Sequence, residues 1–441
     1  MRPLESLSLD ACLDLLSRAF YSVADSRDPS ALNYTLHDTL MSGFACLFFH
    51  HPSLLEFQRS MKRKRKLCNL ETIFRVRDIP SDTQMRDILD GAPTEALRRL
   101  LPKLFERVRR AGWTGDFKTT IFTGVDKGDY YTLALDGSDY FHSTKIECSS
   151  CLHRKDKQGE THYYHTVVAA TLVRARSHRI FPLDVEEVRN TDGSQKQDCE
   201  LNAAKRLIDR FRAEHRQMRV IVTGDDLYSH GPFLEQLESK GLHYVIVAKP
   251  DSHKETFEWV EEIDALGESL RGSWQEGPAS KRLKYEYRVV KQVPINGERK
   301  TFVTVLEVWE RNRKGKLLYH NSWVTDLEVN QENVGKIIWI GRSKWKIENE
   351  QFNVQKNHGY ELEHNYGHGK KGLGMIFYLL NLLAFVVHQI LERGDRLYRK
   401  IREEETLREL WNGLRTMMRM MLFESWKAML ERYVEDEGRS P

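Results

Sequence analysis

Two kinds of hydrophobic pattern divide this chain. From Leu9 to about Phe105 the apolar residues recur at helical spacing, with a break at Ile79-Pro80. Ser81 is a favoured N-cap residue and predicts a new helix that starts near Thr83. The pattern therefore predicts an all-helical N-terminal region.

After Asp129 the pattern changes to short runs rich in Val, Ile, Thr and Tyr, which are typical of strands. The first of these runs ends at Asp136, and the fourth ends at Asp225-Asp226. The order is three strands, helix, strand, helix, strand. We predict strands at 130–135, 163–173, 179–183, 218–223 and 243–248, and helices at 196–215 and 232–240.

Residues 271–327 interrupt this alternation. Turn signals at Asn296-Gly297 and Lys314-Gly315 separate runs in which apolar and polar residues alternate. Such runs predict an antiparallel β insertion. Its strands are expected at 281–290, 301–309 and 317–325.

The next helix is predicted to start near Asn333 and to present one continuous face. Five of the six positions on this face are small or apolar, and the sixth is the carboxylate of Glu348. An ionised carboxylate on a buried face is costly without a cation, so we expect a metal ion or a basic side chain beside it. The face consists of Val334, Ile338, Gly341, Trp345, Glu348 and Phe352.

Residues 373–387 form a run of 15 residues without a charge. A membrane span needs about 20 apolar residues, and this run contains Asn381 and ends at His388-Gln389. We therefore expect a buried core helix and no contact with a membrane. A charged amphipathic helical tail follows.

The element order defines the predicted fold class and domains. It is the order of the ribonuclease-H-like fold, an α/β fold with a mixed sheet and helices, here interrupted by the β insertion and joined to helical regions at both ends. We predict a helical N-terminal domain at 1–115, the first part of the catalytic domain at 116–265, the insertion at 266–328, the completed catalytic domain at 329–392 and a helical C-terminal tail at 393–441.

Composition adds one local feature to the predicted fold, a basic segment in the N-terminal region. The chain has 441 residues, 40% of them hydrophobic and 30% charged, which is typical of a soluble folded protein. The net charge is only +4, but residues 51–115 hold 15 Lys and Arg against 8 Asp and Glu. The run Lys62–Lys66 in this segment suits contact with DNA phosphates, and a solvated helix face is the alternative. Six Cys without a secretory signal indicate a reducing compartment, the cytoplasm.

Three carboxylates could meet in the predicted fold. Neighbouring strands present their end residues side by side, so Asp136 and Asp225 are expected close together, and a helix packed on the sheet could add Glu348. Such a set can hold two divalent cations about 3.5–4 Å apart, which is the arrangement that cleaves phosphodiesters. Asp226 competes with Asp225 as the second ligand, with helix capping as its other role. Asp139 and Glu200 are expected at the surface or behind the ligands.

These residues resemble a known family. The motifs are Leu135-Asp136-Gly, Gly224-Asp225-Asp226-Leu-Tyr228 and, above all, the block from Arg342 to His364 with Trp345, Glu348 and Asn349. The chain resembles, over roughly residues 129–390, the DDE transposases of bacterial insertion sequences, in the branch with a β-rich insertion between the second Asp and the Glu.

The resemblance implies a function and its partners. The protein would bind the terminal inverted repeats of its element, cut the DNA with two Mg²⁺ or Mn²⁺ ions held by Asp136, Asp225 and Glu348, and join the 3′-ends to a target. It would act on double-stranded DNA as a homodimer, in the cytoplasm with the nucleoid. A ribonuclease-H-like nuclease or resolvase, and a transposase-derived DNA-binding protein without catalysis, are the alternatives.

The chain departs from the family signature at the positions of its basic residues. The signature of the branch is Tyr, two residues, Arg, three residues, Glu, six residues, Lys, and the chain has Gly341, Lys344, Glu348 and Gln355 at these positions. In the family these basic residues hold DNA phosphates, and a Gly-rich basic loop after the helix also suits a DNA backbone. The predicted DNA-binding residues are Arg342, Lys344, Trp345, Lys356, His364 and Lys370.

Aromatic residues of the insertion could also contact DNA. Family members with the insertion stack a flipped base on an aromatic residue. Trp274, Trp309 and Trp323 are candidates, with core packing as the alternative for each.

A second metal site is suggested after the first predicted strand. Cys148-Ser-Ser-Cys151-Leu-His153 precedes His162 and His165. Two Cys with nearby His can bind a structural zinc ion, although the spacing here is not that of a standard zinc finger. Cys148, Cys151, His153 and His165 are the predicted zinc ligands, and an exposed hairpin without a ligand is the alternative.

Overall fold

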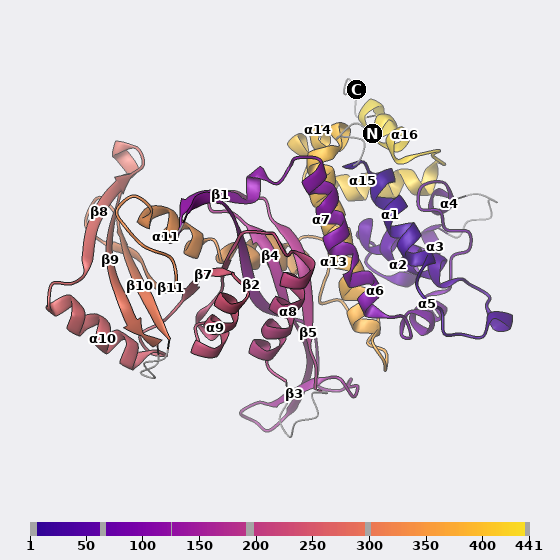
Figure 1. Cartoon of the computed structure of the whole chain (residues 1–441). Coiled ribbons are helices and arrows are strands. Elements are labelled where there is room, and N and C mark those ends of the chain that lie inside the picture. The colour runs from indigo at the N-terminus through magenta and orange to yellow at the C-terminus, as the bar shows by residue number, and fades with distance from the viewer. Residues whose placement is uncertain (1–6, 62–67, 125, 191–197, 296–300, 437–441) are drawn as a thin grey trace.

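A computed structural model describes residues 7–61, 68–124, 126–190, 198–295 and 301–436. The protein is an α/β structure in which a mixed, mostly antiparallel sheet lies beside a helical region (Figure 1). The basic run Lys62–Lys66 and the predicted turn at Asn296-Gly297 lie outside the described residues.

The N-terminal region is helical, as predicted. Ser81 caps the fifth helix through a capping box in which Gln84 completes the reciprocal hydrogen bonds, and the helix begins at Asp82. The helices are α1 (Leu9–Tyr21), α2 (Leu36–Phe48), α3 (Leu54–Met61), α4 (Asn69–Thr72), α5 (Asp82–Leu89), α6 (Thr94–Arg98) and α7 (Leu100–Arg110).

One sheet of 11 strands runs through the rest of the protein in the order β3-β4-β2-β6-β7-β11-β10-β9-β8, with β1 paired to β2 and β5 to β4. The pairs β2–β6 and β6–β7 are parallel, and the other pairs are antiparallel. The first strands are β1 (Lys118–Phe122), β2 (Lys127–Ser143), β3 (Leu152–Lys155), β4 (Thr161–Val173), β5 (Phe181–Val188), β6 (Val220–Thr223) and β7 (His243–Val247).

The predicted alternation of strands and helices is confirmed between β5 and β7. The helices between these strands are α8 (Glu200–Glu214) and α9 (Gly231–Ser239), and α10 (Lys254–Ala265), which was not predicted, follows β7. Strands β1 and β3 were not predicted, and β2 continues eight residues beyond the predicted end at Leu135. This extension includes Asp136, Ser138 and His142, whose polar side chains hide the strand from a search for apolar runs.

The insertion extends the central sheet and does not form a separate one. Its last strand pairs with β7, with Val324 opposite Ile246. The predicted strands are confirmed, and a further strand, β8, lies at the edge. The insertion consists of β8 (Leu270–Glu276), β9 (Leu283–Pro294), β10 (Phe302–Arg311) and β11 (Leu317–Thr325).

The helix predicted from Asn333 is interrupted. Helix α11 (Val334–Arg342) follows Asn333, whose side chain makes no capping hydrogen bond. A turn then occupies Ser343-Lys344, and residues 347–352 form a π-helix, η7 (Ile347–Phe352), that leads into α12 (Asn353–Asn357). Trp345, directly after this turn, is 52% exposed. The expectation of one continuous buried face was therefore wrong, although four of its members, Val334, Ile338, Gly341 and Phe352, are buried.

The apolar run at 373–387 is a core helix, as predicted. Helix α13 (Leu373–Gly394) is long and apolar enough to cross a membrane, but 89% of its apolar window is buried inside the protein. It packs against α2, α6, α7 and β5. The chain then forms α14 (Arg396–Glu404), α15 (Leu407–Met420) and α16 (Trp426–Asp436), which join the same helical region (Figure 1).

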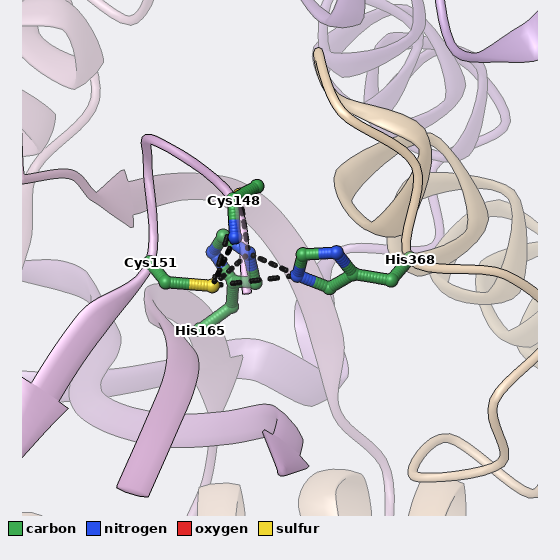
Figure 2. A group of neighbouring side chains, drawn as sticks. All are labelled: Cys148, Cys151, His165 and His368. Carbon is green, nitrogen blue, oxygen red and sulfur yellow. Dashed lines mark hydrogen bonds between the residues drawn. The ribbon is translucent and has the colours of Figure 1, made fainter. Parts of the chain in front are cut away.

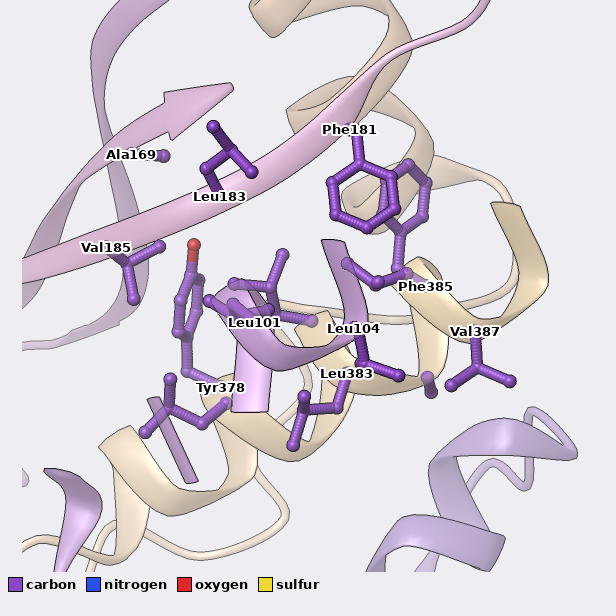
Figure 3. Close-up of a cluster of buried hydrophobic side chains, with 14 of the residues drawn as sticks. Leu101, Leu104, Ala169, Phe181, Leu183, Val185, Tyr378, Leu383, Phe385 and Val387 are labelled. Atoms are coloured by element: carbon purple, nitrogen blue, oxygen red, sulfur yellow. The ribbon is translucent and has the colours of Figure 1, made fainter. Parts of the chain in front are cut away.

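The helical region and the sheet share one hydrophobic core. Figure 3 shows Leu101 and Leu104 of α7 and Phe385 of α13 facing Phe181 and Leu183 of β5. A buried ion pair crosses the same boundary, because Arg98 of α6 donates to Asp184 of β5 at 2.8 Å. These contacts fix the sheet against the helices.

Candidate active site and metal centre

Asp136 and Asp225 lie at the same level on two neighbouring parallel strands. Ala134 of β2 pairs with Thr223 of β6, and each aspartate follows two residues later. Asp136 is 7% exposed, and Asp225 is half-buried. The sheet therefore places the two predicted carboxylates side by side.

The residues around Asp225 fix its side chain. Gly224 lies so close to Tyr228 that an added Cβ would be 2.7 Å from the ring. Asp225 caps the short 3-10 turn that follows, and its Oδ1 accepts a hydrogen bond from the N–H of Leu227 at 3.0 Å. Capping was expected of Asp226, which instead accepts from the N–H of Lys249 at 2.6 Å.

Glu348 lies on η7, which packs against β2. Its side chain is 34% exposed, so it is less buried than the helical pattern predicted. Its cationic neighbour is Lys344, whose ammonium group donates to Glu348 and lies 3.5 Å from Oδ1 of Asp136. The expected partner of Glu348 is thus a basic side chain in this structure. A π-helical turn is rare and frequently marks a functional site.

The carboxylates raise one another's proton affinity. Burial is the largest cause that raises the pKa of Asp136 to about 7; Lys344 lowers it, and the charges of Glu348, Asp225 and Glu200 raise it further. Burial opposes the ionisation of Lys344, but the neighbouring carboxylates outweigh it and raise the pKa of the ammonium group. Lys344 therefore stays a cation among the acids.

Glu200 lies behind Asp136 in this cluster, which is one of the two positions expected for it, the other being the surface. It stands at the start of α8, accepts a hydrogen bond from the hydroxyl of Tyr228 at 2.5 Å, and lies against Gly137, where an added Cβ would be 2.4 Å from its Oε2. Burial raises the pKa of Glu200, and the Tyr228 hydroxyl opposes this shift. Gly137, next to Asp136, was the available signal, because only a glycine leaves room for this carboxylate.

The cluster has the donor chemistry of a magnesium site. Carboxylate oxygens are the ligands that Mg²⁺ and Mn²⁺ prefer. Among the described residues, Asp136, Asp225 and Glu348 do not bring three ligand atoms within 4.8 Å of one another. Two ions would not require this, because each binds only part of the set. The ammonium of Lys344 stands where positive charge is needed between Asp136 and Glu348.

Two of the predicted DNA-binding residues make contacts inside the protein. Arg342 donates to Glu310 of β10 at 2.5 Å and lies over the ring of Tyr319, with 4.3 Å to the ring centroid. Lys344 is only 5% exposed. Both side chains thus hold the segment around Glu348 against the sheet.

The other four predicted DNA-binding residues lie at the surface. Trp345 is exposed beside Lys344, and His364 and Lys370 are exposed on the loop between α12 and α13. Lys356 is half-buried and forms an ion pair with Glu363 at 2.8 Å. These positions remain accessible to a nucleic acid.

The three tryptophans of the insertion differ in environment. Trp323 is fully buried, so core packing is confirmed for it. Trp274 stacks on Tyr285 with ring centroids 4.9 Å apart, and Trp309 stacks on His320 at the same separation. Both of these rings are partly exposed.

A second cluster brings together the side chains of Cys148, Cys151, His165 and His368, whose ligand atoms all lie within 4.8 Å of one another. Figure 2 shows His368 approaching the other three side chains from the opposite side. Three of the four predicted ligands are in this cluster. The fourth, His153, is exposed on β3 and does not belong to the group, and His368 takes its place.

His368 could not be assigned from local spacing. It is 203 residues from His165 along the chain, in the Gly-rich loop that we interpreted as a DNA contact.

Asp139, the remaining acidic residue near Asp136, accepts a hydrogen bond from Thr166 across β2 and β4.

No protein-family model matches the chain, and comparison with the curated proteins gives no match.

Proposed function

We propose that the protein is a DDE transposase, which cleaves DNA at the ends of an insertion sequence and joins those ends to a target. The main support is the alignment of Asp136 and Asp225 at one level of two parallel strands, with Glu348 on the helix that packs beside them. Acids from these three positions are the catalytic set of the family that the sequence resembles.

The strand order supports a ribonuclease-H-like fold for the catalytic domain. In β5-β4-β2-β6-β7, β4 is antiparallel to both neighbours, while β2, β6 and β7 run parallel. The β insertion falls between β7 and the Glu348 segment, as in the branch that the sequence resembles.

The proposed roles follow from position and charge. Asp136, Asp225 and Glu348 would hold the ions, with Glu200 behind Asp136. When bound, two Mg²⁺ or Mn²⁺ ions would activate the attacking water or 3′-hydroxyl and stabilise the leaving oxygen. Lys344 partly compensates the charges of Asp136 and Glu348 in the free protein and would shift toward solvent as the ions bind. Exposed Trp345, beside Lys344, is placed to contact a DNA sugar or base.

A cleavage and strand-transfer assay tests this proposal. The substrate is linear DNA that contains the sequences flanking the gene, with Mg²⁺, and the readout is nicked and joined product. Asp225→Asn removes a charge but keeps an oxygen for the cap of the following turn, so the chain should fold. We expect a loss of about 100-fold or more, because even outer partners of metal ligands cost about 10–100-fold. Glu348→Gln should lose cleavage and strand transfer to a similar extent.

The matched controls are Asp251→Asn and Glu332→Gln, which change exposed acids outside the cluster. They should retain wild-type rates. Product formation by Asp225→Asn at the wild-type rate would overturn the catalytic assignment. Nicked DNA without joined product would identify a nuclease, and binding of the ends without metal-dependent cleavage would identify a DNA-binding protein.

A further inference from the structure

We propose that Cys148, Cys151, His165 and His368 bind one structural Zn²⁺ ion. This site is separate from the carboxylate cluster, and its argument does not depend on the proposed transposase activity. The four ligands come from three segments: the loop after β2, strand β4, and the loop between α12 and α13.

The separations between the ligand atoms are those of a tetrahedron around zinc. With Zn–S near 2.3 Å and Zn–N near 2.0–2.1 Å, the edges should be about 3.8 Å for S···S, about 3.5 Å for S···N and about 3.3 Å for N···N. The two Sγ atoms are 3.7 Å apart, and the two Nε2 atoms are 3.2 Å apart. The Sγ atom of Cys151 lies 3.4 Å from each Nε2, and that of Cys148 lies 3.5 Å from Nε2 of His165.

The outer nitrogens of both imidazoles face acceptors. Nδ1 of His368 lies 3.0 Å from the carbonyl oxygen of Gly369, whereas Nδ1 of His165 makes no hydrogen bond to the described residues and lies 3.6 Å from Oε1 of Glu187. The hydroxyl of Tyr140 donates to the same carboxylate at 2.9 Å and fixes it. A proton held on Nδ1 leaves Nε2 with its lone pair toward the centre, which is the usual arrangement of metal-binding histidines.

The surroundings indicate a structural ion and not a catalytic one. Cys151, His165 and His368 are buried, and Cys148 is half-buried. Four protein ligands complete the tetrahedron, whereas a catalytic zinc keeps one position for water or substrate. The alternative for the two thiols, a disulfide, leaves unexplained why both imidazoles point at the sulfurs.

Zinc in this position would join the two halves of the candidate active site. Strand β2 bears Asp136 and leads into the loop with Cys148 and Cys151, and the loop that contains His368 follows the Glu348 segment. The same loop is held on its other side by Asp90 of the helical region, which accepts a hydrogen bond from the N–H of Lys370 at 2.9 Å. The ion would therefore fix the loop between the sheet and the helices.

Metal content and a cobalt spectrum test the inference on the full-length protein. Wild-type protein purified under reducing conditions should contain about one zinc per chain. Replacement with Co²⁺ should give the d–d bands of a tetrahedral ion and a thiolate charge-transfer band. Cys151→Ser and His368→Asn should lose the zinc and both spectral features.

The controls separate this ligand set from the one predicted by sequence. His153→Asn, His358→Asn and Cys199→Ser change neighbouring or exposed residues outside the cluster and should keep the metal and the spectrum. Loss of zinc in His153→Asn with retention in His368→Asn would overturn the assignment.

Wild-type protein provides a test even if a variant fails to fold. A wild-type chain without zinc and without a tetrahedral Co²⁺ spectrum would overturn the proposal, and so would a Cys148–Cys151 disulfide in the protein purified under reducing conditions. Removal of zinc by a chelator should lower the melting temperature, and added zinc should restore it. These readouts do not involve DNA cleavage, so they stand or fall independently of the proposed function.

Discussion

The ammonium nitrogen of Lys344 lies 3.5 Å from Oδ1 of Asp136, and both side chains are less than a tenth exposed. Lys344 also donates to Glu348, so one buried cation serves two acids of the proposed catalytic set. A buried charge without a partner is far more costly than a paired one. In the free protein Lys344 thus supplies part of the positive charge that the carboxylates require.

Replacing this lysine should destabilise the fold. Lys344→Met leaves Asp136 buried among other acids, and breaking a buried pair in this way costs about 3–5 kcal/mol. The free energy of unfolding, measured by urea denaturation without added divalent cations, should fall by this amount. Lys254→Met, an exposed change on α10, should alter it by less than about 0.5 kcal/mol. Equal stability of the two variants would show that the pair does not support the fold.

The raised pKa of Asp136 predicts a pH-dependent effect on stability. Between its usual value of 3.8 and about 7 the folded chain binds more protons than the unfolded chain, so this group weakens the fold as pH rises through that window. Asp136→Asn removes the titration while Lys344 keeps Glu348 as its partner. The free energy of unfolding of the variant, relative to that of wild type, should rise by on the order of 1–4 kcal/mol between about pH 5 and about pH 8.

Chemical denaturation of both proteins across this pH range measures the effect. Asp251→Asn is the control, because this exposed residue lies in the loop before α10. A difference between Asp136→Asn and wild type that stays constant with pH would contradict the prediction.

The contact between Gly341 and Trp323 predicts a size limit in α11. A Cβ added to Gly341 would lie 2.5 Å from Nε1 of the fully buried Trp323. Gly341→Ala should therefore destabilise the protein by about 1–3 kcal/mol, because the core would be overpacked. The same helix offers a control in Gly335→Ala, where the added Cβ meets no atom within 4 Å and helix propensity improves. In thermal melting, Gly341→Ala should have a lower melting temperature than wild type, and Gly335→Ala should not.

Asp90 is predicted to stabilise the start of α13. Its carboxylate accepts hydrogen bonds from the backbone N–H groups of residues 370–373 at distances from 2.9 to 3.1 Å. Asp90→Ala should cost about 1–3 kcal/mol, because these donors lose their acceptor. Asp87→Ala, an exposed change on α5, the helix that Asp90 follows, is the matched control. Urea denaturation at neutral pH compares the two.

The same interaction has a definite pH dependence. Burial would raise the pKa of Asp90, but the hydrogen bonds from residues 370–373 lower it below 3.8. Its stabilising effect is thus complete above pH 3.8 and is lost as pH falls through the lower pKa of the folded state. The difference between wild type and Asp90→Ala should shrink in strong acid, and a difference that grows there would contradict this assignment.

Much of the architecture was predictable because it rests on apolar periodicity. Strands β6 and β7 and helix α13 bury nearly continuous apolar runs, and each was predicted from its run. The π-helix was not predictable. Lys344 is buried by its ion pairs and not by apolar character, so the hydrophobic pattern gave no sign of the break beside it.

In the candidate sites, too, some residues were predictable from the sequence and others were not. Asp136 and Asp225 were found because each follows an apolar run in the sequence, although Asp136 lies within β2. His368 was not assigned to its cluster, and for Glu200 the surface and a position behind the ligands both stayed open, because only tertiary packing brings these residues to their clusters. Gln355, at the position where the family that the sequence resembles has Lys, also has a physical reason. It is fully buried and donates to Asn381 at 3.1 Å, where an ammonium group would lack a partner anion.

The packing of α2 against α13 has a consequence for synthesis. Every residue of α2 is buried in the finished fold, yet α13 begins only at Leu373. At about 5–20 residues per second, the ribosome needs roughly tens of seconds to make the chain between them, and α2 lacks its cover for that time. The packing of α2 can be completed only in chains that extend through α13. A copy that ends before Leu373 would therefore leave the α13-facing side of α2 uncovered.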